Sequence, residues 1–75
     1  MRFQAIIPPV YETEITGFVC GGEKRIGKAL WRVEVYRGEY FPRVFKNGAR
    51  VASIGGLPAT VQALGYEVAA LSSML

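Results

Sequence analysis

Apolar positions follow a period of two through most of the chain and a period between three and four near its end. The clearest alternation spans residues 29–37, where Trp31, Val33 and Val35 are separated by charged or tyrosine side chains. A strand with one buried face produces this period, because successive side chains point to opposite sides. We therefore expect a strand over residues 29–37, with its tryptophan and valines turned inward.

Weaker patterns of the same kind predict four further strands, over residues 2–7, 10–20, 40–46 and 49–54. The first should be an edge strand, since it stops at Pro8-Pro9 and proline cannot donate a ladder hydrogen bond. The second is rich in Thr, Ile, Val and Tyr, side chains that are enriched in strands, and should bend at Gly17.

Glycine-containing segments separate these strands. The run over residues 21–28 predicts a mobile basic loop, and Gly38-Glu39 predicts a tight reversal. Asn47-Gly48 tolerates positive φ at both central positions of a type I′ turn, so a hairpin is expected there.

Residues 57–75 predict a helix, in which Pro58 is acceptable in the first turn. Gly65 should weaken this helix by about 1 kcal/mol relative to alanine. Glu67 is its one charged residue. Its apolar seam has spacings of four and three residues and consists of Leu57, Val61, Leu64, Val68, Leu71 and Leu75.

Together these elements predict one α+β domain over residues 1–75, with the order β-β-β-β-β-α. An antiparallel sheet of four or five strands should carry the C-terminal helix on one face. Strands followed by a helix resemble, in arrangement only, the sheet-reading DNA-binding domains of the integrase-arm type and the dimeric single-stranded-DNA binders.

Two-residue loops in both hairpins would place Val44 and Val51 on the face of Trp31. Glu34 would then lie opposite Arg43 as a cross-strand ion pair, and a bulge would be required, which we expect at Pro42 because it lacks an amide hydrogen. A three-residue first loop would instead turn Phe41 and Phe45 inward and bury the Arg43 guanidinium, at a high cost. We therefore favour the first arrangement, with guanidinium groups and rings side by side on the outer face.

The cations are concentrated in one segment. The net charge is +3, with an isoelectric point near 9.4, and residues 23–50 carry eight cations against three acids, or +5. Cations interleaved with aromatic rings suit nucleic acid, because cations displace counterions from phosphates and rings stack on bases. The expected nucleic-acid-binding residues are Lys24, Arg25, Lys28, Arg32, Tyr36, Phe41, Arg43, Phe45, Lys46 and Arg50.

Catalytic and metal chemistry find little support in the composition. The chain has no histidine and one cysteine, Cys20, which we interpret as a small buried apolar residue. Glu12 and Glu14 would share a strand face but have no polar partners, and the serines have no base to activate them. We expect no enzyme activity, no cofactor and no metal.

Residues 22–28 match the start of a phosphate-binding P-loop, but Ala29 stands where a magnesium-binding Ser or Thr is needed and a strand follows in place of a helix. As a plain basic loop, the same residues could still contact phosphates. The N-terminal residues do not form a secretory signal and no apolar run is long enough to span a membrane, so a cytoplasmic location is the default expectation.

Two functions remain open. The first is a small nucleic-acid-binding protein, and the alternative is a protein-interaction module or small inhibitor of the kind that mobile elements encode, docking through its helix or its basic sheet. Small uncharged residues on the far side of the helix suit a homodimer or a partner protein. The expected interface residues are Ala59, Ala63, Tyr66, Ala70 and Met74.

Overall fold

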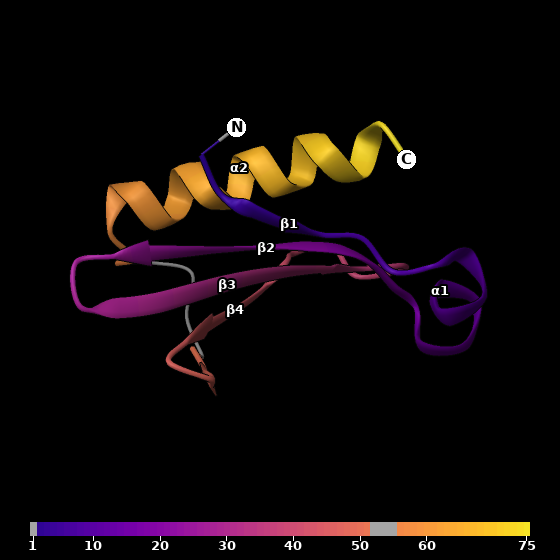
Figure 1. The fold of residues 1–75 in the computed structure, drawn as a ribbon, viewed down its shortest axis with the longest axis horizontal. Helices are drawn as coiled ribbons and strands as arrows, with labels where there is room; N and C mark the ends of the chain where they lie inside the picture. The colour runs from indigo at the N-terminus through magenta and orange to yellow at the C-terminus, as the bar shows by residue number, and fades with distance from the viewer. Residues whose placement is uncertain (1, 52–55) are drawn as a thin grey trace.

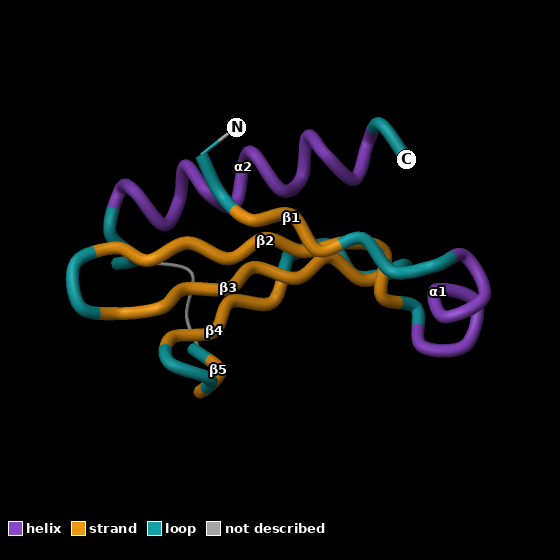
Figure 2. The backbone as a smooth tube through the Cα atoms, in the orientation of Figure 1, coloured by secondary structure: helices purple, strands orange, loops and turns teal. Residues whose placement is uncertain are grey.

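Five antiparallel strands pair in chain order, and one helix lies across one face of their sheet (Figures 1 and 2). The computed structural model describes residues 2–51 and 56–75. Its elements are β1 (Gln4–Ile6), α1 (Val10–Thr16), β2 (Phe18–Ile26), β3 (Ala29–Tyr36), β4 (Arg43–Lys46), β5 (Ala49–Arg50) and α2 (Ala59–Ser73). The α+β class and the C-terminal helix are therefore confirmed.

The core lies between α2 and the two longest strands, β2 and β3. Val61, Leu64, Val68 and Leu71 of the helix seam are buried there, whereas Leu75 at the end of the predicted seam is exposed. The sheet contributes Cys20, Trp31, Val33 and Val44. Burial raises the pKa of the Cys20 thiol, whose Sγ lies 3.8 Å from the Val68 carbonyl oxygen.

Pairing of β3 with β4 confirms the predicted faces of both strands. Val33 lies opposite Val44 and Glu34 opposite Arg43. Directly paired residues share a face, so Val44 joins Trp31 and Val33 under α2 while the charged pair faces away. We call the face turned away from α2 the outer face.

The loop predicted over residues 21–28 is wrong, because most of that run belongs to β2. Gly22 is buried, and a Cβ at this position would lie 2.6 Å from the Phe3 ring and 2.7 Å from a Val68 methyl group. The glycine is thus required by the close approach of neighbouring side chains. Only Gly27 and Lys28 form the turn, so backbone amides of this run that pair in the sheet are not free to bind phosphate.

The strand predicted over residues 10–20 is also wrong in its first half, where α1 forms. Pro9 precedes the helix in an extended conformation, and Gly17 ends it with a φ of 79°. Thr16 accepts a hydrogen bond from the Phe18 amide at 3.0 Å. These local end signals outweigh the strand preference of the β-branched residues. Glu12 and Glu14 consequently lie on a helix, not on one strand face.

The bulge predicted at Pro42 is absent, and the register irregularity lies instead between Phe18 and Cys20 in β2. The connection from β3 to β4 is longer than the predicted two-residue loop, because β4 begins only at Arg43. The Asn47 amide then bonds toward β3, at Leu30 O, while the Val44 carbonyl accepts from Val51 on the β5 side. Alternate residues along this segment therefore hydrogen-bond to β3 and to the β5 side, and no extra residue is needed.

The Asn47-Gly48 turn is confirmed, with φ angles of 51° and 84°. The strand that follows it is shorter than predicted over its described part, since β5 covers Ala49–Arg50. Residues 52–54 of the predicted strand lie outside the described residues. The predicted first strand is confirmed as an edge strand, shortened to β1.

Replacing Gly22→Ala should destabilise the protein by about 1–3 kcal/mol, because the new methyl group overpacks the contact between Phe3 and Val68. Gly65→Ala is the matched control, since a Cβ there meets no neighbour within 4 Å and alanine is the better helix former. Urea denaturation in dilute solution should show opposite signs for the two variants. Equal stabilities would contradict the close packing at Gly22.

Candidate nucleic-acid interface

The outer face carries the central group of predicted site residues. Cross-strand pairs place Arg32 beside Phe45 and Glu34 beside Arg43, and Tyr36 follows on the same side of β3. These five side chains are half-buried. The structure therefore brings them together as the sequence predicted, but they mostly contact one another.

Arg43 is held by two neighbours. Its Nε and Nη2 donate to the Glu39 carboxylate at 3.1 and 2.5 Å, and its guanidinium carbon lies 3.7 Å from the centre of the Tyr36 ring. Phe18 packs against the same ring, with 5.5 Å between centroids. A phosphate would have to displace Glu39, and a base would have to displace Arg43 from the tyrosine. Arg43 and Tyr36 therefore make contacts that stabilise the sheet and are not free to bind a ligand.

Hydrogen bonding and burial shift the pKa values within this group. The hydrogen bond from Arg43 lowers the pKa of Glu39. Burial, and then the hydrogen bond that the Tyr36 hydroxyl donates to Glu34 at 2.9 Å, raise the pKa of Tyr36. The Glu39 carboxylate thus remains charged where it contacts Arg43.

Arg32 is paired with Glu34, not left free. Its Nε lies 2.6 Å from Glu34 Oε2, although this buried N–H is not aligned well enough for a hydrogen bond. The predicted ion pair between Glu34 and Arg43 is therefore wrong: the two residues are opposite in register, but each pairs with another residue.

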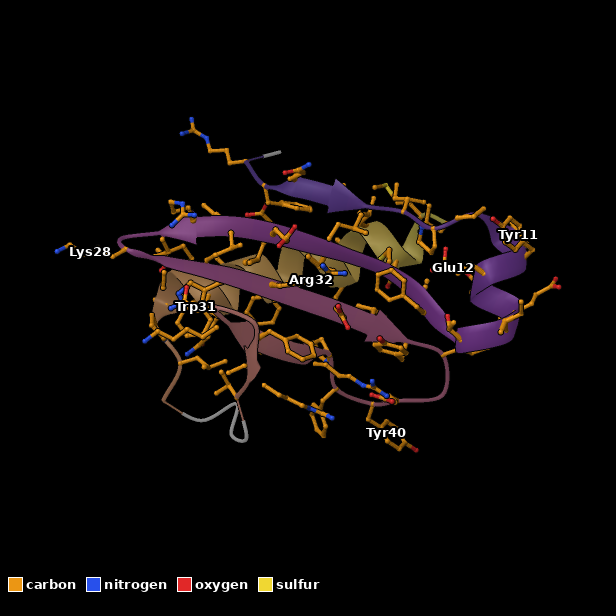
Figure 3. The ribbon with its side chains drawn as sticks, turned by 60° about the horizontal axis from the view of Figure 1, so that its bottom comes forward. Tyr11, Glu12, Lys28, Trp31, Arg32 and Tyr40 are labelled. Atoms are coloured by element: carbon orange, nitrogen blue, oxygen red, sulfur yellow. The ribbon has the colours of Figure 1, made fainter. Side chains whose placement is uncertain are left out.

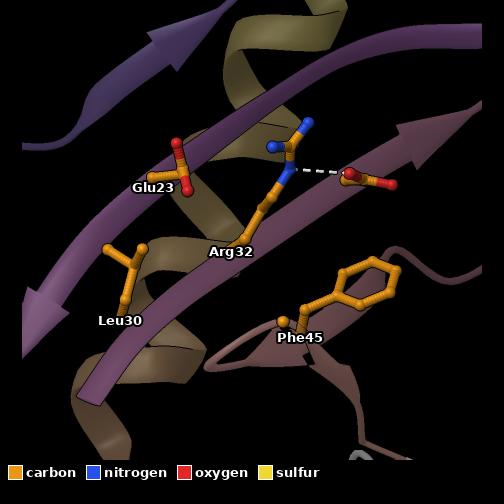
Figure 4. Close-up of a pocket in the computed structure, with 6 residues that line it drawn as sticks. Glu23, Leu30, Arg32 and Phe45 are labelled. Atoms are coloured by element: carbon orange, nitrogen blue, oxygen red, sulfur yellow. Dashed lines mark ion pairs between the residues drawn. The ribbon is translucent and has the colours of Figure 1, made fainter.

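A shallow hollow surrounds Arg32 on the outer face (Figure 4). Leu30 and Phe45 supply apolar walls, and Glu23 of β2 lies directly opposite Arg32 of β3. Glu34 lines the same hollow. Because two carboxylates accompany one guanidinium here, the hollow is not an anion site.

Five of the seven side-chain cations without an ion pair among the described residues gather instead at one end of the sheet, and the other two are Arg2 and Arg37. Register places Lys24 and Lys46 on either side of Trp31, and Arg50 opposite Phe45. The two hairpin tips are tied together, since the Leu30 amide donates to Asn47 Oδ1 at 2.9 Å. We define the basic end as Lys24, Arg25, Lys28, Lys46 and Arg50. Among the described residues, none of these cations forms an ion pair.

The basic end surrounds the hairpin tips at one end of the sheet, and its residues lie on both faces. Arg25 and Arg50 lie on the outer face by alternation, Lys24 and Lys46 lie on the α2 face, and Lys28 occupies the turn between β2 and β3. Figure 3 shows Lys28 at this tip. Trp31 is 6% exposed and the Lys46 ammonium group lies 5.5 Å from its ring centre, so Trp31 cannot stack on a base.

The opposite end of the molecule is acidic and apolar. Figure 3 shows Tyr11 and Glu12 on α1, and Tyr40 in the connection to β4, far from Lys28. Tyr40 is 98% exposed, and α1 has no buried residue. The two acids of α1 therefore lie at the other end of the sheet from the basic end.

Phe41 does not lie with the outer-face rings. It lines an apolar groove beside α2 together with Val44 and Tyr66, on the face of the sheet that the helix covers. The expectation that Phe41 faces outward is wrong, because the longer connection changes how the chain enters β4. The predicted helix-surface residues are all exposed: Ala59, Ala63, Tyr66, Ala70 and Met74.

The sequence did not identify Leu30 and Asn47 as parts of the site. Asn47 was recognised as a turn residue, but its side-chain bond to the Leu30 amide depends on the register between β3 and β4. Leu30 is apolar but lies on the outer face, where polar residues are usual. The sequence could have indicated this position, because Leu30 precedes the inward-facing Trp31 in the alternating strand.

Comparison with protein-family models, curated proteins and solved structures gave no match for this chain. Within residues 2–51 and 56–75, no three acidic or cysteine side chains lie close enough together to hold a metal ion. No helix in the described part of the chain has both the length and the apolar character to cross a membrane. The function must therefore be argued from the geometry of the surface.

Arg43→Gln should raise the midpoint at which Glu39 titrates, because the hydrogen bond that lowers the Glu39 pKa is lost. In the parent protein, this contact stabilises the fold above the ordinary pKa of glutamate, and that contribution disappears as pH falls through the lowered pKa of Glu39. Carboxyl-detected NMR titration of both proteins measures the two midpoints. Identical midpoints would show that Arg43 does not hold Glu39 in solution.

Proposed function

We propose that this protein binds nucleic acid through its basic end. The observation that carries the proposal is the division of the cations: Arg32 and Arg43 are each paired with a glutamate, whereas five cations at the hairpin tips have no ion-pair partner among the described residues. Cations without internal partners are available to phosphates, and their contact with a polyanion releases condensed counterions.

The spacing of these cations suits an extended backbone. Lys24 and Lys46 flank β3, so their strands are separated by about 10 Å, or two interstrand spacings. Lys28 projects beyond both at the tip. A sugar-phosphate chain crossing this end would meet several cations in succession, while the acidic α1 end would repel it.

Apolar surface beside the cations supports base contact. Phe45 and Leu30 are half-buried in the hollow on the outer face, next to Arg50 and Arg25 in the cross-strand rows. A base from a single-stranded segment can lie against these side chains without displacing an ion pair. Phe45 therefore replaces Tyr36 and Phe41 as the aromatic contact in this proposal.

Docking on a protein partner is the second candidate function. The observation that favours it is α1, where Val10, Tyr11 and Ile15 are 68–81% exposed and no residue is buried. Such a surface is unusual for a helix that serves only its own fold.

A Lys24→Gln/Lys28→Gln double variant should weaken nucleic-acid binding and reduce its salt dependence. Each lost phosphate contact lowers the slope of log affinity against log salt by about 0.7–0.9, so the pair should lower it by about 1.5. Fluorescence anisotropy between about 50 and 200 mM salt, with labelled single-stranded DNA, duplex DNA and RNA, measures this slope.

Arg37→Gln is the matched control, since it removes one exposed cation at the α1 end. The Arg37 backbone amide bonds Gly17 O at 2.8 Å and is unaffected by the change. This variant should retain the parent slope. No binding to any of the three nucleic acids in low salt, or equal slopes for the parent and the double variant, would refute the proposal and favour a protein partner.

A further inference from the structure

An uncharged groove runs between α2 and the start of β4. Phe41 and Pro42 form one side and Gly65, Tyr66 and Ala69 the other. The helix makes most of its contacts with β2 and β3, and the groove lies on the β4 side of these contacts. Phe41 and Tyr66 remain 69% and 76% exposed. Two large rings thus face solvent beside a groove with no charged lining residue among those described.

The groove contains both a projecting group and a space to receive one. A Cβ built on Gly65 meets no heavy atom within 4 Å, so the helix surface is open at this point of the groove. A two-fold interface requires a patch that is complementary to itself, because the same residues contribute on both sides. An exposed phenylalanine and an open glycine on one patch meet this requirement.

We infer that this groove is the contact surface for a second copy of the chain, with Phe41 of each protomer seated over Gly65 of the other. Charge favours a second copy over a charged foreign partner. The net charge of +3 resides mainly in the sheet hairpins, whereas the groove is neutral, so two copies meet here without opposing cations.

Size supports the same occupant. A chain of 75 residues is near the lower limit for a single core, and a shared apolar interface adds burial to both copies. A stable interface needs about 800 Å² from each partner. Two largely exposed rings supply roughly 200–300 Å² of it. The small residues on the adjoining side of α2, including Ala63 and Ala70, allow the close approach that the remainder requires.

Gly65→Leu tests the inference without endangering the fold. The added side chain enters open space in the single chain and improves helix propensity, but it fills the space that Phe41 of the second copy requires. Tyr66→Lys places a charge in the same groove. Tyr40→Lys is the matched control, because Tyr40 is also an exposed tyrosine and does not line the groove.

Light scattering after size exclusion, at about 100 µM protein, reports the mass of each variant, and circular dichroism confirms that each is folded. The parent and Tyr40→Lys should give about 16 kDa, twice the 8.2 kDa of one chain. Gly65→Leu and Tyr66→Lys should give the mass of one chain. A parent of 8.2 kDa overturns the inference, and so do folded groove variants that keep the doubled mass.

Discussion

The arrangement depends on the close packing of α2 against β2 and β3. Val68 of the helix and Phe3 of the N-terminal segment both approach Gly22 so closely that no side chain fits there. Because the helix covers one face, every strand residue is assigned to the helix side or to the outer side. The buried row of Gly22, Val33 and Val44 follows from this contact, and so does the outward position of the charged residues.

The alternation of side chains between the two faces of the sheet does not by itself make a binding surface. The arginines in the middle of the outer face meet acids on the same face or in the neighbouring loop, and Arg43 also lies over the Tyr36 ring. Half-burial favours such internal pairs, because an unpaired cation there would lose solvation without compensation. At the hairpin tips solvent is close, so lysines and arginines remain unpaired at little cost. Pairing with nearby acids thus distinguishes the arginines that stabilise the sheet from the cations that remain available to a ligand.

Much of the fold was predictable. The helix seam and the alternation around Trp31 were correct because a long periodic pattern is enforced by the core it faces. The errors occurred where the same residue type is found in two kinds of local structure. The β-branched residues of α1 are typical of strands, yet Pro9 and Gly17 end the segment as a helix. Gly21 and Gly22 were interpreted as loop residues, although here they lie in β2 and allow neighbouring residues of other elements to approach it closely.

By itself the sequence determined the α+β class, the inward row of the central strand, the Asn47-Gly48 turn and the concentration of cations in residues 23–50, because these follow from periodicity, local backbone preference and composition. The tertiary structure decided which cations are neutralised, which way Phe41 faces and how the hairpin tips meet. Those outcomes depend on register and on the length of the connection between β3 and β4, which set the contacts between residues far apart in the chain.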